Sequence, residues 1–112
     1  MLKYEMYGEE FDIGFSIDEY CTNDNLAVVM YCKDADGLVE TFGYMTVNID
    51  YLPQPMACLD TNNIVGIEKW VTDNNLGTDT GRRIVSGFCE YPVYILNLEA
   101  IKRHLMFSEV TK

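Results

Sequence analysis

Strict alternation of apolar and polar residues in one segment constrains the fold of this chain more than any other feature. Apolar residues at every second position alternate with polar residues or glycine: Phe11, Ile13, Phe15 and Ile17 against Asp12, Gly14, Ser16 and Asp18. This period of two is typical of a β-strand with one buried face and one face in water. The water-facing side carries Glu10, Asp12 and Asp18. The sequence therefore predicts a strand with an acidic outer face.

The neighbouring segments predict further antiparallel strands. Leu2, Tyr4 and Met6 indicate a short first strand, with a turn at residues 8–10. Residues 26–32 are apolar on both faces, which favours an interior strand. Residues 33–37 are typical of a hairpin turn, and a long strand is expected from 39 to 49. The two prolines in residues 51–55 end the sheet, because proline cannot donate to a central ladder.

The last third of the chain predicts two helices. Thr61, Asn62 and Asn63 are candidate N-caps for a helix with Ile64, Ile67 and Val71 on one side, flanked by Trp70 and ending at Leu76–Gly77. Residues 78–81 are expected to form a loop, and residues 83–88 and 91–96 one bent strand or two short ones. Asn97 caps a final helix whose apolar positions are Leu98, Ile101 and Leu105. The most economical fold is α+β: an antiparallel sheet of about five to six strands with two helices packed on one face.

Length and composition place this fold in a single domain spanning residues 1–112. The 48% of hydrophobic residues and the eight tyrosines argue against disorder. The first residues have no apolar core typical of a signal peptide. The longest apolar run, residues 26–32, is far shorter than the ~20 residues that a membrane helix needs. We therefore expect a cytoplasmic protein of a bacterial host cell.

The residues that usually carry catalysis or metal binding do not form recognisable motifs. Cys21, Cys32, Cys58 and Cys89 contain no close pair of the kind used by zinc sites and redox dithiols, so reduced thiols are expected. The sequence has a single histidine, His104, and no motif that would place a catalytic nucleophile beside it. The Asp34-x-Asp36-Gly37 segment lacks the remaining ligands of a calcium loop, and no phosphate-binding glycine loop is present. We expect no enzyme activity, cofactor or metal.

The net charge is confined to the first half of the chain. Residues 1–60 carry twelve acidic residues against Lys3 and Lys33, whereas residues 61–112 carry six of each sign. Such an imbalance repels nucleic acid and attracts basic partners. We expect a basic protein surface to bind Glu10, Asp12, Asp18, Glu19, Asp24, Asp34, Asp36 and Glu40.

A second polar constellation offers another candidate site. If the first helix packs on the sheet, Asp60–Asn63 would meet Thr80–Arg83 and Ser86–Phe88 and form a small polar site. The alternative is that Asp60–Asn63 cap the helix while Arg82 pairs with a nearby acid, and we favour this second interpretation.

Several short motifs resemble a known family: Tyr44–Asn48, Leu59–Asn63, Ile67–Trp70, Asn75–Gly77, Thr80–Arg82 and Ser86–Tyr94. The family consists of small uncharacterised proteins carried by conjugative elements, plasmids and phages of Firmicutes. The resemblance covers about residues 44–96 and leaves the acidic half outside. Because the family has no established catalytic residues, the resemblance implies a context, that of an accessory protein of a mobile genetic element, and no reaction.

Two functions follow as expectations. The first is a non-enzymatic inhibitor that occupies the basic nucleic-acid-binding surface of a host defence nuclease, as DNA-mimicking anti-CRISPR and anti-restriction proteins do. Its physical basis is that a groove built for phosphates accepts a spaced row of carboxylates. The second is an accessory protein-interaction domain of a conjugative element, without an inhibitory role.

Overall fold

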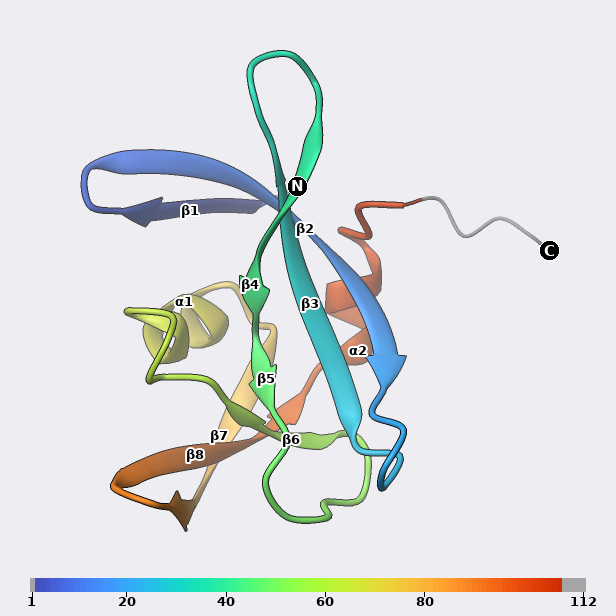
Figure 1. Ribbon diagram of the computed structural model, residues 1–112, viewed down its shortest axis with the longest axis vertical. Coiled ribbons are helices and arrows are strands. Elements are labelled where there is room, and N and C mark those ends of the chain that lie inside the picture. The colour runs from blue at the N-terminus through green and yellow to red at the C-terminus, as the bar shows by residue number, and fades with distance from the viewer. Residues whose placement is uncertain (1, 108–112) are drawn as a thin grey trace, which may run out of the picture.

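Two four-stranded antiparallel sheets make up most of the molecule (Figure 1). They are seen in a computed structural model that describes residues 2–107. Sheet A has the order β1-β2-β3-β4, and sheet B has the order β5-β6-β8-β7. The elements are β1 Leu2–Met6, β2 Glu9–Glu19, β3 Leu26–Lys33, β4 Val39–Tyr44, β5 Thr46–Val47, β6 Met56–Leu59, α1 Ile67–Asp73, β7 Gly77–Ser86, β8 Cys89–Leu96 and α2 Leu98–Lys102.

The alternating segment forms the inner part of sheet A, as its pattern predicts. Ile13 and Phe15 on β2 are fully buried, while Asp12 and Asp18 are exposed. The doubly apolar β3 lies between β2 and β4, so the prediction of an interior strand is confirmed. Strand pairing thus follows the hydrophobic pattern, because a one-residue slip would turn the apolar side chains to water.

The predicted single sheet is wrong, because the chain changes sheets in the middle of the expected 39–49 strand. β4 ends at Tyr44 in sheet A, and β5 begins at Thr46 in sheet B. Between them Met45 is fully buried, and its backbone N–H donates to the Val28 carbonyl at 2.9 Å. The unexpected β6 then pairs with β5 and β8. The α+β class holds in broad terms: residues 2–107 form eight strands in two sheets and two short helices.

The first helix is much shorter than the sequence predicts. α1 begins after Gly66, whose φ of 79° lies in the left-handed region that favours glycine, and it ends at Asp73. The expected caps at 61–63 therefore lie in turns that precede the helix. Ile64, Ile67 and Val71 are buried as expected. Gly77 opens β7 and does not end the helix.

The carboxyl-terminal third contains a hairpin followed by the second helix. β7 and β8 are two paired strands, and the expected loop at 78–81 lies within β7, where the register shifts between Asp79 and Arg83. Asn97 caps α2 as predicted, its side-chain oxygen accepting from the Ala100 N–H at 3.2 Å. Leu105, expected on that helix, lies beyond its end.

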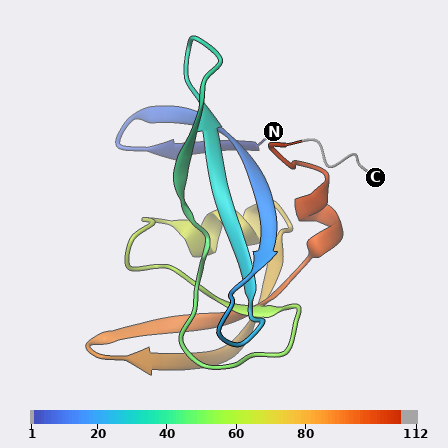
Figure 2. The ribbon, with the colours of Figure 1, turned by 45° about the vertical axis from the view of Figure 1, so that its right-hand side comes forward.

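Residues 104–106 complete the free edge of β2. β1 pairs with β2 only as far as Ile13, which leaves the same edge open at Phe15. There the Phe15 N–H donates to the His104 carbonyl at 2.8 Å, and the Met106 N–H donates to the Phe15 carbonyl at 2.9 Å. Figure 2 shows the segment after α2 returning to the outer part of the molecule near β2. Residues 104–106 thus continue the hydrogen bonding along the edge of β2 that β1 begins.

The main core lies between the sheets and includes residues from both helices. Phe15, Met30, Leu59, Ile67 and Ile101 are among its fully buried members. A second, smaller cluster on sheet B contains Leu52, Cys58, Ile84, Tyr91 and Val93.

Candidate functional site

Sheet A divides into two hairpins beyond the level at which Ile13 pairs with Cys32. The β1–β2 hairpin and the β3–β4 hairpin leave the common sheet in different directions (Figure 1). Together they carry seven exposed acidic residues, Glu5, Glu9, Glu10, Asp12, Asp34, Asp36 and Glu40, against two exposed lysines, Lys3 and Lys33. We call this part of the molecule the acidic hairpins. Their net charge is −5 by this count.

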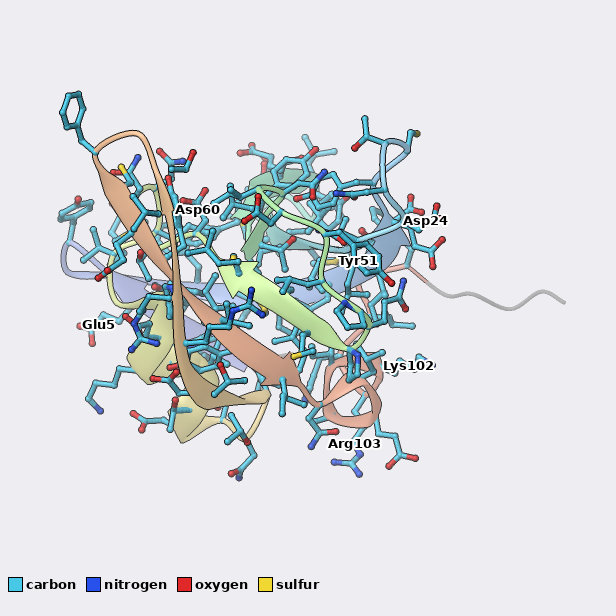
Figure 3. All side chains as sticks on the ribbon, turned by 90° about the horizontal axis from the view of Figure 1, so that it is seen from below. Glu5, Asp24, Tyr51, Asp60, Lys102 and Arg103 are labelled. Atoms are coloured by element: carbon cyan, nitrogen blue, oxygen red, sulfur yellow. The ribbon has the colours of Figure 1, made fainter. Side chains whose placement is uncertain are left out.

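The structure divides the eight expected binding residues into two groups. Glu10, Asp12, Asp34, Asp36 and Glu40 lie on the acidic hairpins. Asp18, Glu19 and Asp24 lie at the other end of β2 and in the turn that follows it. Figure 3 shows Glu5 of β1 and Asp24 on opposite sides of the molecule.

The expected acidic row on β2 is interrupted. Between Asp12 and Asp18 the same face carries Gly14 and Ser16. A Cβ on Gly14 would lie 3.0 Å from Met106, so this stretch of the face is covered by the chain itself. Asp18 and Glu19 instead line a cavity of about 330 Å³ together with Lys102 of α2. The hairpin group is therefore separate from Asp18 and Glu19, which lie beside a lysine.

Several of the expected residues have partners within the molecule. Asp12 forms an ion pair with Lys3 at 2.5 Å, and this contact raises the pKa of Lys3. The Asp34 carboxylate accepts backbone N–H groups of Asp36 and Leu38 at 2.9 Å and so shapes the tip of its hairpin. Glu19 accepts from the Gln54 amide at 2.7 Å. Among the residues that the structure describes, Glu10, Asp36 and Glu40 have no such side-chain contact.

A like-charged pair that the sequence reasoning missed lies on the β1–β2 hairpin. Glu5 stands directly opposite Glu10 in the register of the two strands. Like charges in this position destabilise a hairpin. The expected turn at residues 8–10 is wrong: the turn is Tyr7–Gly8, and Glu9 and Glu10 belong to β2. A two-residue turn at this place pairs residue 6 with 9 and residue 5 with 10.

A groove runs along this pair. It has a volume of about 410 Å³ and is lined by residues of the first hairpin and of α1, among them Glu5, Glu10, Lys69 and Trp70. The indole N–H of Trp70 donates to the Lys3 carbonyl at 2.6 Å, and its ring packs against Tyr4 with the centroids 4.8 Å apart. These contacts fix both walls of the groove.

The second expected site, around Asp60 and the 80–88 segment, consists of locally satisfied groups. The buried Asp60 carboxylate accepts from the backbone and the side chain of Asn63, at 3.2 and 2.8 Å. Arg83, rather than Arg82, pairs with an acid: its guanidinium donates to Asp79 at 3.0 and 3.1 Å, which lowers the pKa of Asp79. The predicted capping of the helix by Asp60–Asn63 is wrong, because the N-cap of α1 is Gly66 and receives no side-chain hydrogen bond. The predicted pairing with an acid is made by Arg83 and not by Arg82.

Burial shifts the pKa of thiol groups and of the single histidine. All four cysteines are free, and burial raises the pKa of Cys58. Burial lowers the pKa of His104, whose buried Nδ1 has no hydrogen-bond partner in the described part of the chain. Within residues 2–107 no three His, Cys, Asp or Glu side chains are placed to hold a metal ion. Neither helix in that range is long and apolar enough to cross a membrane.

Comparison with known proteins gives one family. The family model described as Domain of unknown function (DUF4313) matches residues 14–109. The match reaches well beyond the 44–96 segment that carries the sequence resemblance, and it includes the β3–β4 hairpin while leaving out Glu10 and Asp12. No curated protein and no solved structure matches the chain.

Proposed function

We propose that this chain, which belongs to the DUF4313 family, is a non-enzymatic protein that binds a basic surface of a partner protein through its acidic hairpins. The observation that carries the proposal is the concentration of seven exposed carboxylates against two lysines on these hairpins. A partner with clustered lysines and arginines is attracted to such a surface over a Debye length, whereas a protein with an acidic surface is repelled.

The proposed partner is a host defence nuclease, and the bound surface is its nucleic-acid groove. In this role the chain is an anti-CRISPR or anti-restriction inhibitor in the cytoplasm of a bacterium that carries a mobile element. On β2 Glu10 and Asp12 are alternate residues and lie ~6.6–6.8 Å apart, close to the distance between neighbouring phosphates of a nucleic-acid strand. The two hairpins, rather than one continuous row on β2, provide the carboxylates.

A capture experiment tests the proposal. The wild-type chain, the β3–β4 hairpin variant Asp36→Lys/Glu40→Lys and a matched control, Glu90→Lys/Glu99→Lys, are immobilised and exposed to bacterial lysate. All four residues are exposed, and both variants change the net charge equally. We expect the wild type and the control to retain the same basic protein, and the hairpin variant to lose it. Retention should fall as NaCl is raised, and added duplex DNA should displace the retained protein.

The outcomes separate the two functions. Equal capture by the hairpin variant and the wild type would contradict binding through the acidic hairpins. Hairpin-dependent capture that duplex DNA does not displace would reject the inhibitor and favour the accessory protein-interaction domain of a conjugative element.

A further inference from the structure

Side-chain contacts join the two sides of the groove between the β1–β2 hairpin and α1. Trp70 of α1 donates its indole N–H to the Lys3 carbonyl of β1 at 2.6 Å. The Tyr4 hydroxyl donates in turn to the Val65 carbonyl just before α1. Tyr4 is 2% exposed, so this side chain is an anchor between the two elements. A ligand would meet walls that are already in place, which lowers the entropic cost of binding.

Two carboxylates along the groove, those of Glu5 and Glu10, form no ion pair with a described residue. Lys3 pairs with Asp12 at 2.5 Å, and Lys69 pairs with Asp73 at 2.6 Å. Both lysines at the groove therefore have a closer acidic partner than Glu5 or Glu10, and the charge of Glu10 also acts on Lys3. Glu5 and Glu10 lie opposite each other on β1 and β2, and neither forms an ion pair with a described residue. A cation placed between them would relieve their repulsion.

We propose that this groove binds an arginine side chain of the partner protein, with the guanidinium between Glu5 and Glu10 and against the indole of Trp70. The inference rests on the proposed function and names the residue type that its basic partner presents. Arginine fits better than lysine, because its planar group donates to two carboxylates at once and also stacks on an aromatic face. The 410 Å³ volume accommodates one long side chain.

The test uses the chain's single tryptophan as a reporter inside the site. A blocked pentapeptide, Gly-Gly-Arg-Gly-Gly, is titrated into the labelled protein at low salt while the Trp70 indole N–H signal is followed by NMR. The same peptide with citrulline, which has the shape of arginine without its charge, and with lysine are the comparison probes. We expect a saturable shift with arginine, binding at least several-fold weaker with lysine, and no saturable shift with citrulline.

Variants show whether the two carboxylates are responsible. Glu5→Gln/Glu10→Gln should weaken arginine-peptide binding at least tenfold, while the matched control Glu90→Gln/Glu99→Gln should bind like the wild type. Because the first variant removes a repulsion on an exposed hairpin, it should also be at least as stable to heat as the wild type. Equal affinity for the lysine or citrulline peptide, or unchanged binding by Glu5→Gln/Glu10→Gln, would overturn the proposal.

The same probes distinguish this inference from the function on which it rests. Asp36 and Glu40 do not line the groove. The Asp36→Lys/Glu40→Lys variant should therefore bind the arginine peptide while losing the captured partner. Absence of peptide binding together with hairpin-dependent capture would reject the arginine site alone. Peptide binding without hairpin-dependent capture would reject the proposed function.

Discussion

Buried polar side chains show at the residue scale how this chain fixes its loops. Asn25 is 5% exposed and makes three hydrogen bonds to the segment after β5. Its amide donates to the Asn48 side chain at 2.8 Å and to the Asp50 carbonyl at 2.7 Å, and its oxygen accepts from the Leu52 N–H at 2.9 Å. One side chain thus joins the β2–β3 turn to the proline-containing segment that leads to β6.

Loss of the Asn25 side chain should therefore be costly. Asn25→Ala removes the partner of the buried Leu52 N–H, and an unsatisfied buried group of this kind costs about 1–3 kcal/mol. We expect urea denaturation to show at least this loss in the free energy of unfolding. Thr78→Ala, at an exposed position, should change it by less than about 0.5 kcal/mol. Equal stability of the two variants would mean that water replaces the Asn25 contacts.

The single histidine should make stability depend on pH. Burial, with a smaller effect of Arg103, lowers the pKa of His104 in the folded chain. The unfolded chain therefore binds the proton more readily, and stability falls as the pH drops below about 6.5, the ordinary pKa of histidine. Chemical denaturation of wild type and His104→Gln between pH 8 and 5.5 measures this. We expect the wild type to lose more stability than the variant over that range, and parallel curves would contradict the assignment.

At the scale of elements, the sequence predicts strands best where the spacing of apolar residues within one segment indicates which side chains are buried. The first three strands, the hairpin turn at 33–37 and the Asn97 cap follow from local residue types. The change from sheet A to sheet B at Met45 does not follow from local residue types. Residues 39–49 are uniformly strand-like, and the change of sheet depends on a distant contact with Val28. The same limit applies to α1: its capping residues are present, but Asp60 and Asn63 bond to each other in a preceding turn.

The short α1 should still matter to stability, because its apolar side enters the main core. Ile67 is fully buried there. We expect Ile67→Ala to lower the free energy of unfolding by about 2–5 kcal/mol, as truncations in a packed core do. Lys69→Ala, on the exposed side of the same helix, is the control and should change it little. Similar melting of both variants would show that the helix is not anchored by this side chain.

On the scale of the whole molecule, charge is the property that the sequence predicted most directly, and its placement is what required the structure. The imbalance between the two halves is visible in a count of residues. The count does not show that the acids separate into hairpin and turn groups, because that follows from strand register. The acidic character of the candidate site could therefore be predicted from the composition. The Glu5–Glu10 pair and the groove could not, because they depend on the pairing of two strands.

The net charge of −10 should also set the response to salt. Self-repulsion among exposed carboxylates weakens a compact state, and salt screens it with a Debye length of ~10 Å at 0.1 M. We expect Tm to rise between 10 and 150 mM NaCl, roughly, while partner capture weakens over the same range. Thermal melts of wild type and Asp36→Lys/Glu40→Lys measure the first effect, which should be smaller in the variant. A Tm that falls with added NaCl in both would mean that attractive pairs dominate.

The closure of the β2 edge by residues 104–106 has a consequence for biosynthesis. A ribosome releases β1 to β4 first, but the strip of backbone beside Phe15 has no partner until residues 104–106 have been made. During that interval the nascent sheet presents an unfilled edge, the kind of surface on which strands from other chains add. Slow translation of the segment between β4 and residue 106 should lengthen this exposure, and the yield of native protein should then depend on how quickly the ribosome reaches residues 104–106.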